Sequence, residues 1–339
     1  MIKLGIIGCG GMANYHAEAI GRLDNVQVAV CCDLIEEKAV ALAEKFASAH
    51  CTDHREVYDD VDAVWVCTEP FNRVEIVTAA AAAGKDIFTE KPIALTLEDA
   101  DTMIAAARAA GVKYMLGYCL RFWQPYKMMT EIFALGELGK LVNCWTRRYM
   151  PTDMTPYWYG RQALSGGVAL DFGSHDIDWL MTIGGPVQTV FAKTFRIREG
   201  LEADEHSQCM LIFAGGGMGA SDVTWWESIP ESSLGIVGTK GSLMVGRDGK
   251  LTKMLVGGEE TVIEVESAMA VDMSGHLGRR DEDGEIRRLA AHDETIQEHF
   301  FRCIEEDIQP ITDAQIGRDV LEVVIAVRRS AELGRSVDL

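Results

Sequence analysis

Short apolar runs alternate with longer amphipathic segments over the first third of the chain. The apolar runs are typical of strands buried on both faces of a sheet, and they cover residues 2–7, 26–32, 63–67, 86–89 and 113–117. The segments between them predict helices over 14–23, 36–47, 73–83 and 97–110. Strands that alternate with helices predict right-handed crossovers and a parallel sheet covered on both faces.

After residue 120 the pattern changes to alternating and aromatic stretches, typical of antiparallel strands with one face covered; they lie at 142–149, 189–196, 207–213 and 219–226. Turns rich in glycine separate these stretches, and helices are predicted at 294–306 and 313–333. The charged segment 268–291 has no clean period, so we predict a mobile loop or an irregular excursion there.

A glycine motif follows the first strand. The strand runs into Gly8-Cys9-Gly10-Gly11-Met12-Ala13, and the second strand ends at Asp33, twenty residues after Ala13. Gly8 permits a tight turn, Gly10 lets the backbone approach a pyrophosphate, and the N-terminus of the next helix offers N–H groups to the phosphates. An ordinary strand–helix connection would leave Asp33 unexplained. The pattern predicts a dinucleotide site with contacts from Gly8, Gly10, Gly11, Met12 and Asp33.

Asp33 also indicates which dinucleotide binds. A carboxylate at this position accepts hydrogen bonds from the ribose hydroxyls, and it would repel a 2′-phosphate. Residues 34–37 supply no arginine, and the first basic residue after Asp33 is Lys38. NAD is therefore favoured over NADP.

Polar residues follow several of the predicted parallel strands. The segments Thr68-Glu69-Pro70, Glu90-Lys91-Pro92 and 118–121 all lie at carboxyl ends of strands, where such sheets bind ligands, so we expect them to converge on one crevice. Lys91 could be a surface lysine, but its place between Glu and Pro beyond a buried strand favours a functional role. Further cofactor contacts are expected from Thr68, Glu69, Asn72, Glu90 and Lys91.

A second polar group lies in the segment 166–178. A helix through this segment would place Asp171 and His175 on one face, four residues apart. His175 could be a packed core histidine, or the two residues could be half of a metal site. No third ligand stands at a recognisable spacing, so no metal is predicted. A histidine oriented by a carboxylate can instead move a proton while a hydride leaves.

Charge and cysteine usage exclude several classes of protein. The 339 residues carry a formal net charge of −20, which disfavours nucleic-acid binding. Apolar runs are too short for a membrane span, and the N-terminal run belongs to the first strand rather than to a signal peptide. The 9 cysteines form no C-x-x-C pair, as expected for a protein of the reducing cytoplasm.

Taken together and in this order, the motifs resemble those of the glucose–fructose oxidoreductase / inositol dehydrogenase / MocA family over essentially the whole length. The resemblance rests on residues 8–13, Glu90-Lys91-Pro92, Gly117-Tyr118 with Arg121-Phe122, and Gly166-Gly167 followed by Asp171, His175 and Asp178. It implies an α/β protein with a Rossmann dinucleotide-binding domain over 1–119. It also implies an α+β domain over 120–339 with a large, mostly antiparallel open sheet, which binds substrate and often forms the oligomer interface.

The resemblance further implies that Lys91, Asp171 and His175 form the catalytic group. In one position the chain departs from the family pattern: Arg73 stands where a histidine is common, which puts the contacts on the nicotinamide side in doubt. A sheet with one uncovered face leaves apolar surface that single chains rarely expose, so we expect a homodimer or homotetramer.

Family substrates are mostly sugars, cyclitols and their derivatives. Aromatic faces stack on sugar C–H surfaces, although each aromatic could equally be packing; the candidates are Trp123, Tyr157, Trp158, Tyr159 and Trp179. Arg121 and Arg161 could bind hydroxyls or a substrate carboxylate. The expected substrate contacts are Lys91, Tyr118, Arg121, Trp158, Asp171 and His175. NAD-dependent oxidation of a secondary alcohol is preferred; glycoside cleavage through a transient oxidation and a non-catalytic NAD-binding regulator remain alternatives.

Overall fold

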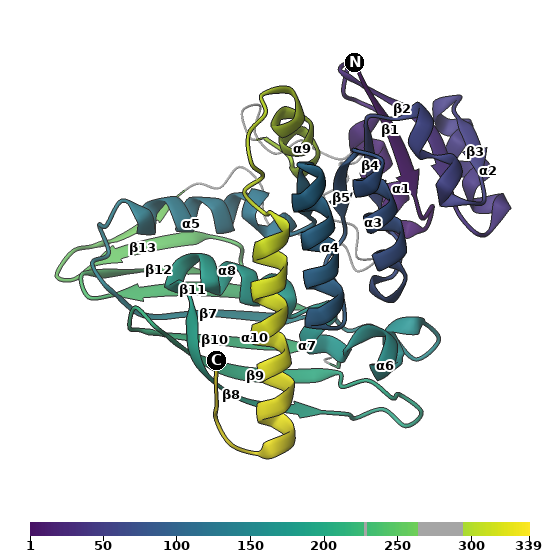
Figure 1. Ribbon diagram of the computed structural model, residues 1–339. Coiled ribbons are helices and arrows are strands. Elements are labelled where there is room, and N and C mark those ends of the chain that lie inside the picture. The colour runs from purple at the N-terminus through teal and green to yellow at the C-terminus, as the bar shows by residue number, and fades with distance from the viewer. Residues whose placement is uncertain (227–228, 264–293) are drawn as a thin grey trace. The chain divides into compact units, whose positions relative to one another are not determined.

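The computed structural model describes residues 1–226, 229–263 and 294–339 (Figure 1). The chain forms two compact units. The first consists of Met1–Tyr118 and Glu294–Leu321, and the second of the described residues of Cys119–Asp293 together with Glu322–Leu339. The predicted segment 268–291 lies outside the described residues.

The first unit is built on a parallel sheet of 6 strands in the order β3-β2-β1-β4-β5-β6, which is the Rossmann order. Its strands are β1 (Ile2–Ile7), β2 (Val26–Cys32), β3 (Ala49–Cys51), β4 (Ala63–Val66), β5 (Asp86–Thr89) and β6 (Tyr114–Leu116). The helices between them are α1 (Gly11–Ile20), α2 (Glu36–Phe46), α3 (Arg73–Ala82) and α4 (Leu97–Ala110). These elements confirm the predicted parallel sheet.

Helix α9 (Ile296–Glu305) returns to this sheet from late in the sequence. Its Phe300 lies edge-on to Trp65 of β4 and Phe88 of β5, which stack on each other with ring centroids 3.6 Å apart. All three side chains are buried. The division expected from the sequence placed all of 120–339 in the second domain, whereas this aromatic packing assigns Glu294–Leu321 to the first unit.

The second unit contains a sheet of 9 strands in the order β14-β13-β12-β11-β7-β10-β9-β8-β15. The strands are β7 (Leu141–Tyr149), β8 (Val187–Phe195), β9 (His206–Phe213), β10 (Met218–Thr224), β11 (Glu231–Gly238), β12 (Gly241–Val245), β13 (Leu251–Leu255), β14 (Glu260–Ile263) and β15 (Val337–Asp338). Within the described part of this second sheet, β7 and β10 are the only neighbours that pair in parallel, so the predicted mostly antiparallel sheet is confirmed.

Helices cover one face of this sheet. Helix α8 (Ser174–Gly184) contacts β7 and β10, and α5 (Gln124–Ala134) packs on α8 (Figure 1). On the opposite face, a row of paired residues crosses from β8 to β12. Three of its large apolar side chains, Phe191, Met210 and Met244, are 39 % to 49 % exposed. Within the described residues, no helix is long and apolar enough to cross a membrane.

Candidate active site

The glycine motif forms the turn between β1 and α1. Gly8 has a φ of +87°, and a Cβ atom on it would lie 2.8 Å from the Thr68 nitrogen, so only glycine fits there. A Cβ on Gly10 or Gly11 would meet nothing within 4 Å. Helix α1 has neither a side-chain cap nor an acidic residue in its first turn. Its N-terminus therefore presents N–H groups and a partial positive charge, which fit the pyrophosphate of a dinucleotide.

Asp33 follows β2 and is held in place by two backbone amides. Its Oδ2 accepts a hydrogen bond of 2.7 Å from Cys9 N, and its Oδ1 accepts one of 2.9 Å from Ile35 N. The side chain of Leu34 beside it is 88 % exposed. The carboxylate is thus fixed next to the glycine turn, where the sequence predicts contact with the adenosine ribose.

Glu90, at the end of β5, belongs to a buried polar group. Its Oε1 lies 2.7 Å from His16 Nε2 of α1, and His16 Nδ1 lies 2.8 Å from Gln297 Nε2 of α9. Burial alone would raise the pKa of Glu90, but the hydrogen bond from His16 and the neighbouring charges of His16, Lys91 and Arg73 outweigh it and lower the pKa. Sequence reasoning missed His16 and Gln297, because neither residue belongs to a motif that reveals its partner.

Lys91 follows Glu90 in the loop after β5, and its backbone N donates to Glu90 Oε2 at 3.1 Å. The Lys91–Pro92 peptide is cis. Beyond β6, a Cβ on Gly117 would lie 2.9 Å from Glu90 Oε1, so glycine there leaves room for the carboxylate. Tyr118 is buried. Both carboxylate oxygens of Glu90 thus have partners within the protein, and a direct contact of this side chain with cofactor stays a prediction.

The remaining predicted cofactor contacts lie at the end of β4. Thr68 and Glu69 are half-buried and Asn72 is exposed. Asn72 Nδ2 donates to Glu69 Oε2 at 3.4 Å. Arg73, the first residue of α3, is 2 % exposed and donates to backbone carbonyl groups, so its side chain is part of the interior of this unit.

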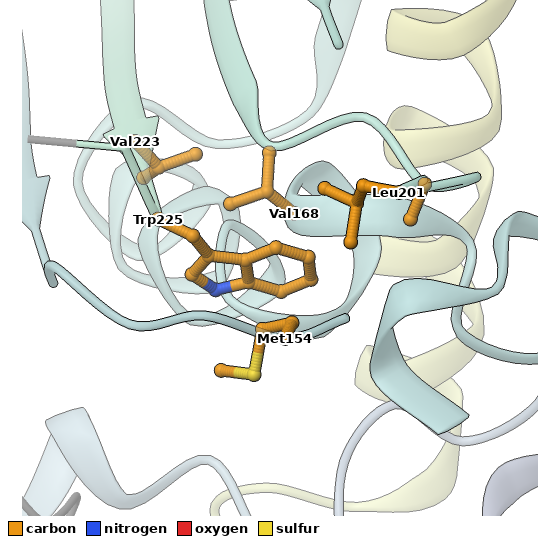
Figure 2. Packing of buried hydrophobic residues seen from close by; sticks show 6 residues of the cluster. Met154, Val168, Leu201, Val223 and Trp225 are labelled. Atoms are coloured by element: carbon orange, nitrogen blue, oxygen red, sulfur yellow. The ribbon is translucent and has the colours of Figure 1, made fainter. Parts of the chain in front are cut away.

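In the second unit, Asp171 and His175 do not share one continuous helix, so the predicted single helix was wrong. Asp171 ends α7 (Gly167–Asp171), and His175 is the second residue of α8. Between the helices, Gly173 N donates to Val168 O at 2.8 Å, a bond that reaches back five residues rather than four. Val168 anchors α7 in an apolar cluster with Met154, Leu201, Val223 and Trp225 (Figure 2).

Arg148 of β7 holds the junction between these two helices. Its guanidinium binds the Asp176 carboxylate at 2.8 to 3.0 Å and donates to Phe172 O at 2.7 Å. It also lies 4.0 Å from the centroid of the Phe172 ring. Burial raises the pKa of Asp176, and Arg148 opposes this rise. Asp171 and His175, each 8 % exposed, thus flank a junction fixed by a buried ion pair that the sequence does not reveal.

Arg121 has a carboxylate partner within the second unit. Its Nε lies 2.9 Å and its Nη2 2.7 Å from the oxygens of Asp178, a fully buried residue of α8. Burial raises the pKa of Asp178, and Arg121 opposes this rise. The pair joins the 3₁₀ turn Cys119–Phe122 to α8, three residues after His175.

Among the candidate aromatics, Trp158 stacks on Tyr159 with ring centroids 3.9 Å apart. Trp179 is fully buried and donates from Nε1 to Thr130 Oγ1 at 3.2 Å, so it is a core residue rather than part of a pocket wall. Across the described ranges, no group of three or more His, Cys, Asp and Glu side chains could hold a metal ion.

Known proteins that resemble this chain identify its family. A family model described as an oxidoreductase family with an NAD-binding Rossmann fold matches residues 2–118, and the C-terminal domain model of the same family matches 126–244. Myo-inositol 2-dehydrogenase of Thermotoga maritima is 27% identical over 100% of this chain and 98% of its own length. The 2,7-anhydro-N-acetylneuraminate hydratase of Escherichia coli is 25% identical over 76% of this chain and 71% of its own length.

Among solved structures, the fold is similar to that of an oxidoreductase from Agrobacterium radiobacter in complex with NAD+, L-tartaric acid and magnesium. The TM-score is 0.84 and the identity 21%, and the match covers 99% of this chain and 98% of the other. This likeness agrees with the strand orders described above. With both family models matching in sequence, the chain belongs to the Gfo/Idh/MocA family of oxidoreductases.

Proposed function

We propose that this protein is an NAD-dependent dehydrogenase that transfers a hydride between nicotinamide and a secondary alcohol or ketone of a sugar, a cyclitol or a sugar derivative. The observation that carries the proposal is the arrangement of the first unit. The glycine turn, the fixed Asp33 carboxylate and the Lys91 loop all lie at carboxyl ends of its parallel strands. This is the edge where such sheets bind a dinucleotide and present its reactive end.

The cofactor would be held by the α1 N-terminus and by Asp33, with further contacts from Thr68, Glu69 and Asn72. When bound, NAD supplies a hydride acceptor. In the proposed reaction His175 takes the hydroxyl proton, Asp171 orients the substrate and His175, and Lys91 steadies the charge that develops on the substrate oxygen. These groups come from both units, Lys91 from the first and Asp171 and His175 from the second.

Several observations support a hydroxyl-rich substrate. A named relative acts on myo-inositol, and Trp158 with Tyr159 offers aromatic surface that can stack on a sugar ring. Tyr118 and Arg121 are the further proposed substrate contacts. Because the Arg121 guanidinium is engaged by Asp178, we assign it to directional hydrogen bonds with hydroxyls rather than to a substrate carboxylate.

We further propose that the protein works in the cytoplasm as a homodimer or homotetramer, with no nucleic-acid or membrane partner. The apolar row on the open face of the large sheet supports self-association, because such surface is rarely left in contact with water.

The test begins with titration of the purified protein with NAD and NADP. Nicotinamide reduction is then followed at its absorbance band across a panel of sugars, inositols and glycosides. The proposal is supported if at least one free polyol reduces the nicotinamide, and if this reduction is lost in Lys91→Ala but kept in Lys250→Ala. Lys250 is a suitable control because its side chain is 65% exposed and pairs only loosely with Asp248, at 3.5 Å.

A second candidate function is glycoside cleavage or hydration through a transient oxidation. The relative named as a hydratase favours it, because hydration involves no net redox change. That reaction would release a leaving group, or add water, without accumulating reduced nicotinamide. Product analysis by mass spectrometry on the same substrate panel separates the two. A non-catalytic regulator would bind NAD and turn over none of the panel.

A further inference from the structure

Arg73 occupies a position that the proposed chemistry does not yet use. It begins α3, immediately after the loop that follows β4, and its side chain is 2 % exposed. Arginine is rarely buried in proteins unless its charge and N–H donors have partners. The identity of the acceptors therefore indicates what Arg73 does.

The guanidinium binds three backbone carbonyls at the ends of two neighbouring strands. Nε and Nη2 both donate to Thr68 O, at 2.9 and 2.7 Å, beyond β4. Nη1 donates to Glu90 O and to Pro92 O, beyond β5. These last two carbonyls belong to the residues on either side of Lys91. One planar side chain thus fixes the backbone before and after the lysine.

Two further contacts limit movement of the same loop. The Glu90 carboxylate accepts from Lys91 N and lies against His16 Nε2. The positive charge of Arg73 also helps to keep Glu90 ionised. The backbone of the lysine is therefore held by Arg73 through its flanking carbonyls and by Glu90 through its own amide.

A guanidinium suits this role better than the side chains that could replace it. It carries five N–H donors in a fixed plane and stays charged at all working pH values. An imidazole has at most two N–H donors, and a lysine ammonium lacks the planar fork. Neither could span three carbonyls at the ends of separate strands in the same way.

We propose that Arg73 is the positioning residue for Lys91: it fixes the loop after β5 so that the lysine ammonium points to the reacting oxygen. The inference rests on the proposed dehydrogenase function. Arg73 itself takes no part in proton or hydride transfer. Its contribution is geometric, and displacement of a catalytic group by about 1 Å can reduce turnover by roughly 10²-fold.

The first experiment compares Arg73→Lys, Arg73→His and Arg73→Ala with Arg55→Met. Arg55 is a matched control because its side chain is 65% exposed and pairs with Glu75 of the same helix α3. We expect kcat to fall by roughly 10²-fold in the three Arg73 variants, with a much smaller change in KM and in NAD affinity. In Arg73→Ala, millimolar guanidinium should restore part of kcat, whereas methylammonium, which lacks the planar fork, should not.

The second experiment needs no substrate. Lysines are acetylated at low reagent concentration, and the rate at Lys91 is read by peptide mass spectrometry relative to Lys85 in the same unit. We expect Arg73→Lys to change the Lys91 rate selectively, since the loop is released while the rest of the unit stays folded. Arg55→Met should leave both rates unchanged.

The outcomes separate the two proposals. Selective change at Lys91 without turnover of any substrate would overturn the dehydrogenase function, while it would support the part of the inference that Arg73 fixes the Lys91 loop. The positioning role would be overturned if folded Arg73→Lys kept its full kcat, or if the decrease in kcat only matched the fraction of unfolded protein. Either result would leave the proposed dehydrogenase function standing. Equal change in the rates at Lys91 and Lys85 would likewise show a general structural role and overturn it.

Discussion

The Cys9 amide donates a 2.7 Å hydrogen bond to the Asp33 carboxylate. It joins the glycine turn after β1 to the acidic residue after β2, so the two halves of the expected cofactor site are held in fixed register. Asp33 therefore keeps one orientation before any nucleotide arrives, which reduces the ordering cost of binding.

The first prediction follows from this fixed carboxylate. NAD should bind more tightly than NADP, because Asp33 can accept ribose hydroxyls and would repel a 2′-phosphate, an effect of about 1–3 kcal/mol. The double substitution Asp33→Ser with Leu34→Arg should narrow or reverse this preference. Calorimetric titration of both nucleotides checks it, with Asp62→Ser as a carboxylate control away from the turn. Equal affinities in the unmodified protein would contradict the argument.

The second prediction concerns proton transfer. His175→Ala should lower turnover by roughly 10²–10⁴-fold, as for a lost general base, and NAD affinity should barely move. Lys91→Ala should lower turnover by a comparable factor. The double variant should lower it by much less than the product of the two single factors, because the two residues act as a unit. The rising limb of the pH–rate profile should disappear or shift in His175→Ala.

A packing histidine gives the control for this experiment. His54 Nδ1 lies 2.6 Å from the Tyr58 hydroxyl, so His54→Ala should lower the Tm and leave the turnover of the folded fraction unchanged. The same behaviour in His175→Ala would falsify its catalytic assignment.

The third prediction tests the ion pair between α7 and α8. Arg148→Met leaves the Asp176 carboxylate buried without its cation and should lower the free energy of unfolding by about 3–5 kcal/mol. Replacing both partners, as in Arg148→Met with Asp176→Leu, should recover much of the loss. Arg147→Met on the same strand, whose side chain is 48% exposed, should cost about 0–1 kcal/mol. Urea denaturation measures these proteins together with the single variant Asp176→Leu, and a loss in the double variant equal to the sum of the two single losses would contradict the pairing.

The fourth prediction concerns self-association through the open sheet face. Met210→Lys with Met244→Lys places charges on the exposed row of β9 and β12 and should shift the protein toward monomer. Glu131→Lys changes charge on the exposed side of α5 and should leave the assembly intact. Light scattering over a dilution series reads the mass. An unmodified protein that is monomeric at micromolar concentration would refute the proposed assembly.

The fifth prediction uses the lowered pKa of Glu90. At pH values between the folded and the unfolded pKa of Glu90, the unfolded chain binds more protons than the folded protein. The stability that this carboxylate contributes is therefore present above its unfolded pKa of about 4.3 and is lost as the pH falls below that value. Glu90→Gln should remove that contribution. The gap in unfolding free energy between the two proteins should thus be larger at neutral pH than in acid. A gap that is constant with pH would mean that the charge of Glu90 does not stabilise the fold.

Much of the first unit could be predicted because its information is local. Apolar runs, helix periods and the spacing from Ala13 to Asp33 are each read within a short stretch of chain. The ion pair of Arg148 with Asp176 was missed because Arg148 lies on β7, far in sequence from the junction between α7 and α8 that it fixes. The edge strand β15 has only 2 residues, too few for an alternating pattern. Helix α9 looked like part of the second domain because its aromatic partners on β4 and β5 lie more than two hundred positions earlier.

The return of Glu294–Leu321 to the first unit has a consequence for recombination. A nucleotide-binding half cut out as one uninterrupted stretch would leave Trp65 and Phe88 without Phe300, and His16 without Gln297. Such a fragment would expose apolar rings and leave a buried polar group without its partner, and it should aggregate. Gene fusions that exchange cofactor preference among relatives must therefore use three crossover points, after Tyr118, before Glu294 and after Leu321, so that the late helical segment travels with the glycine turn.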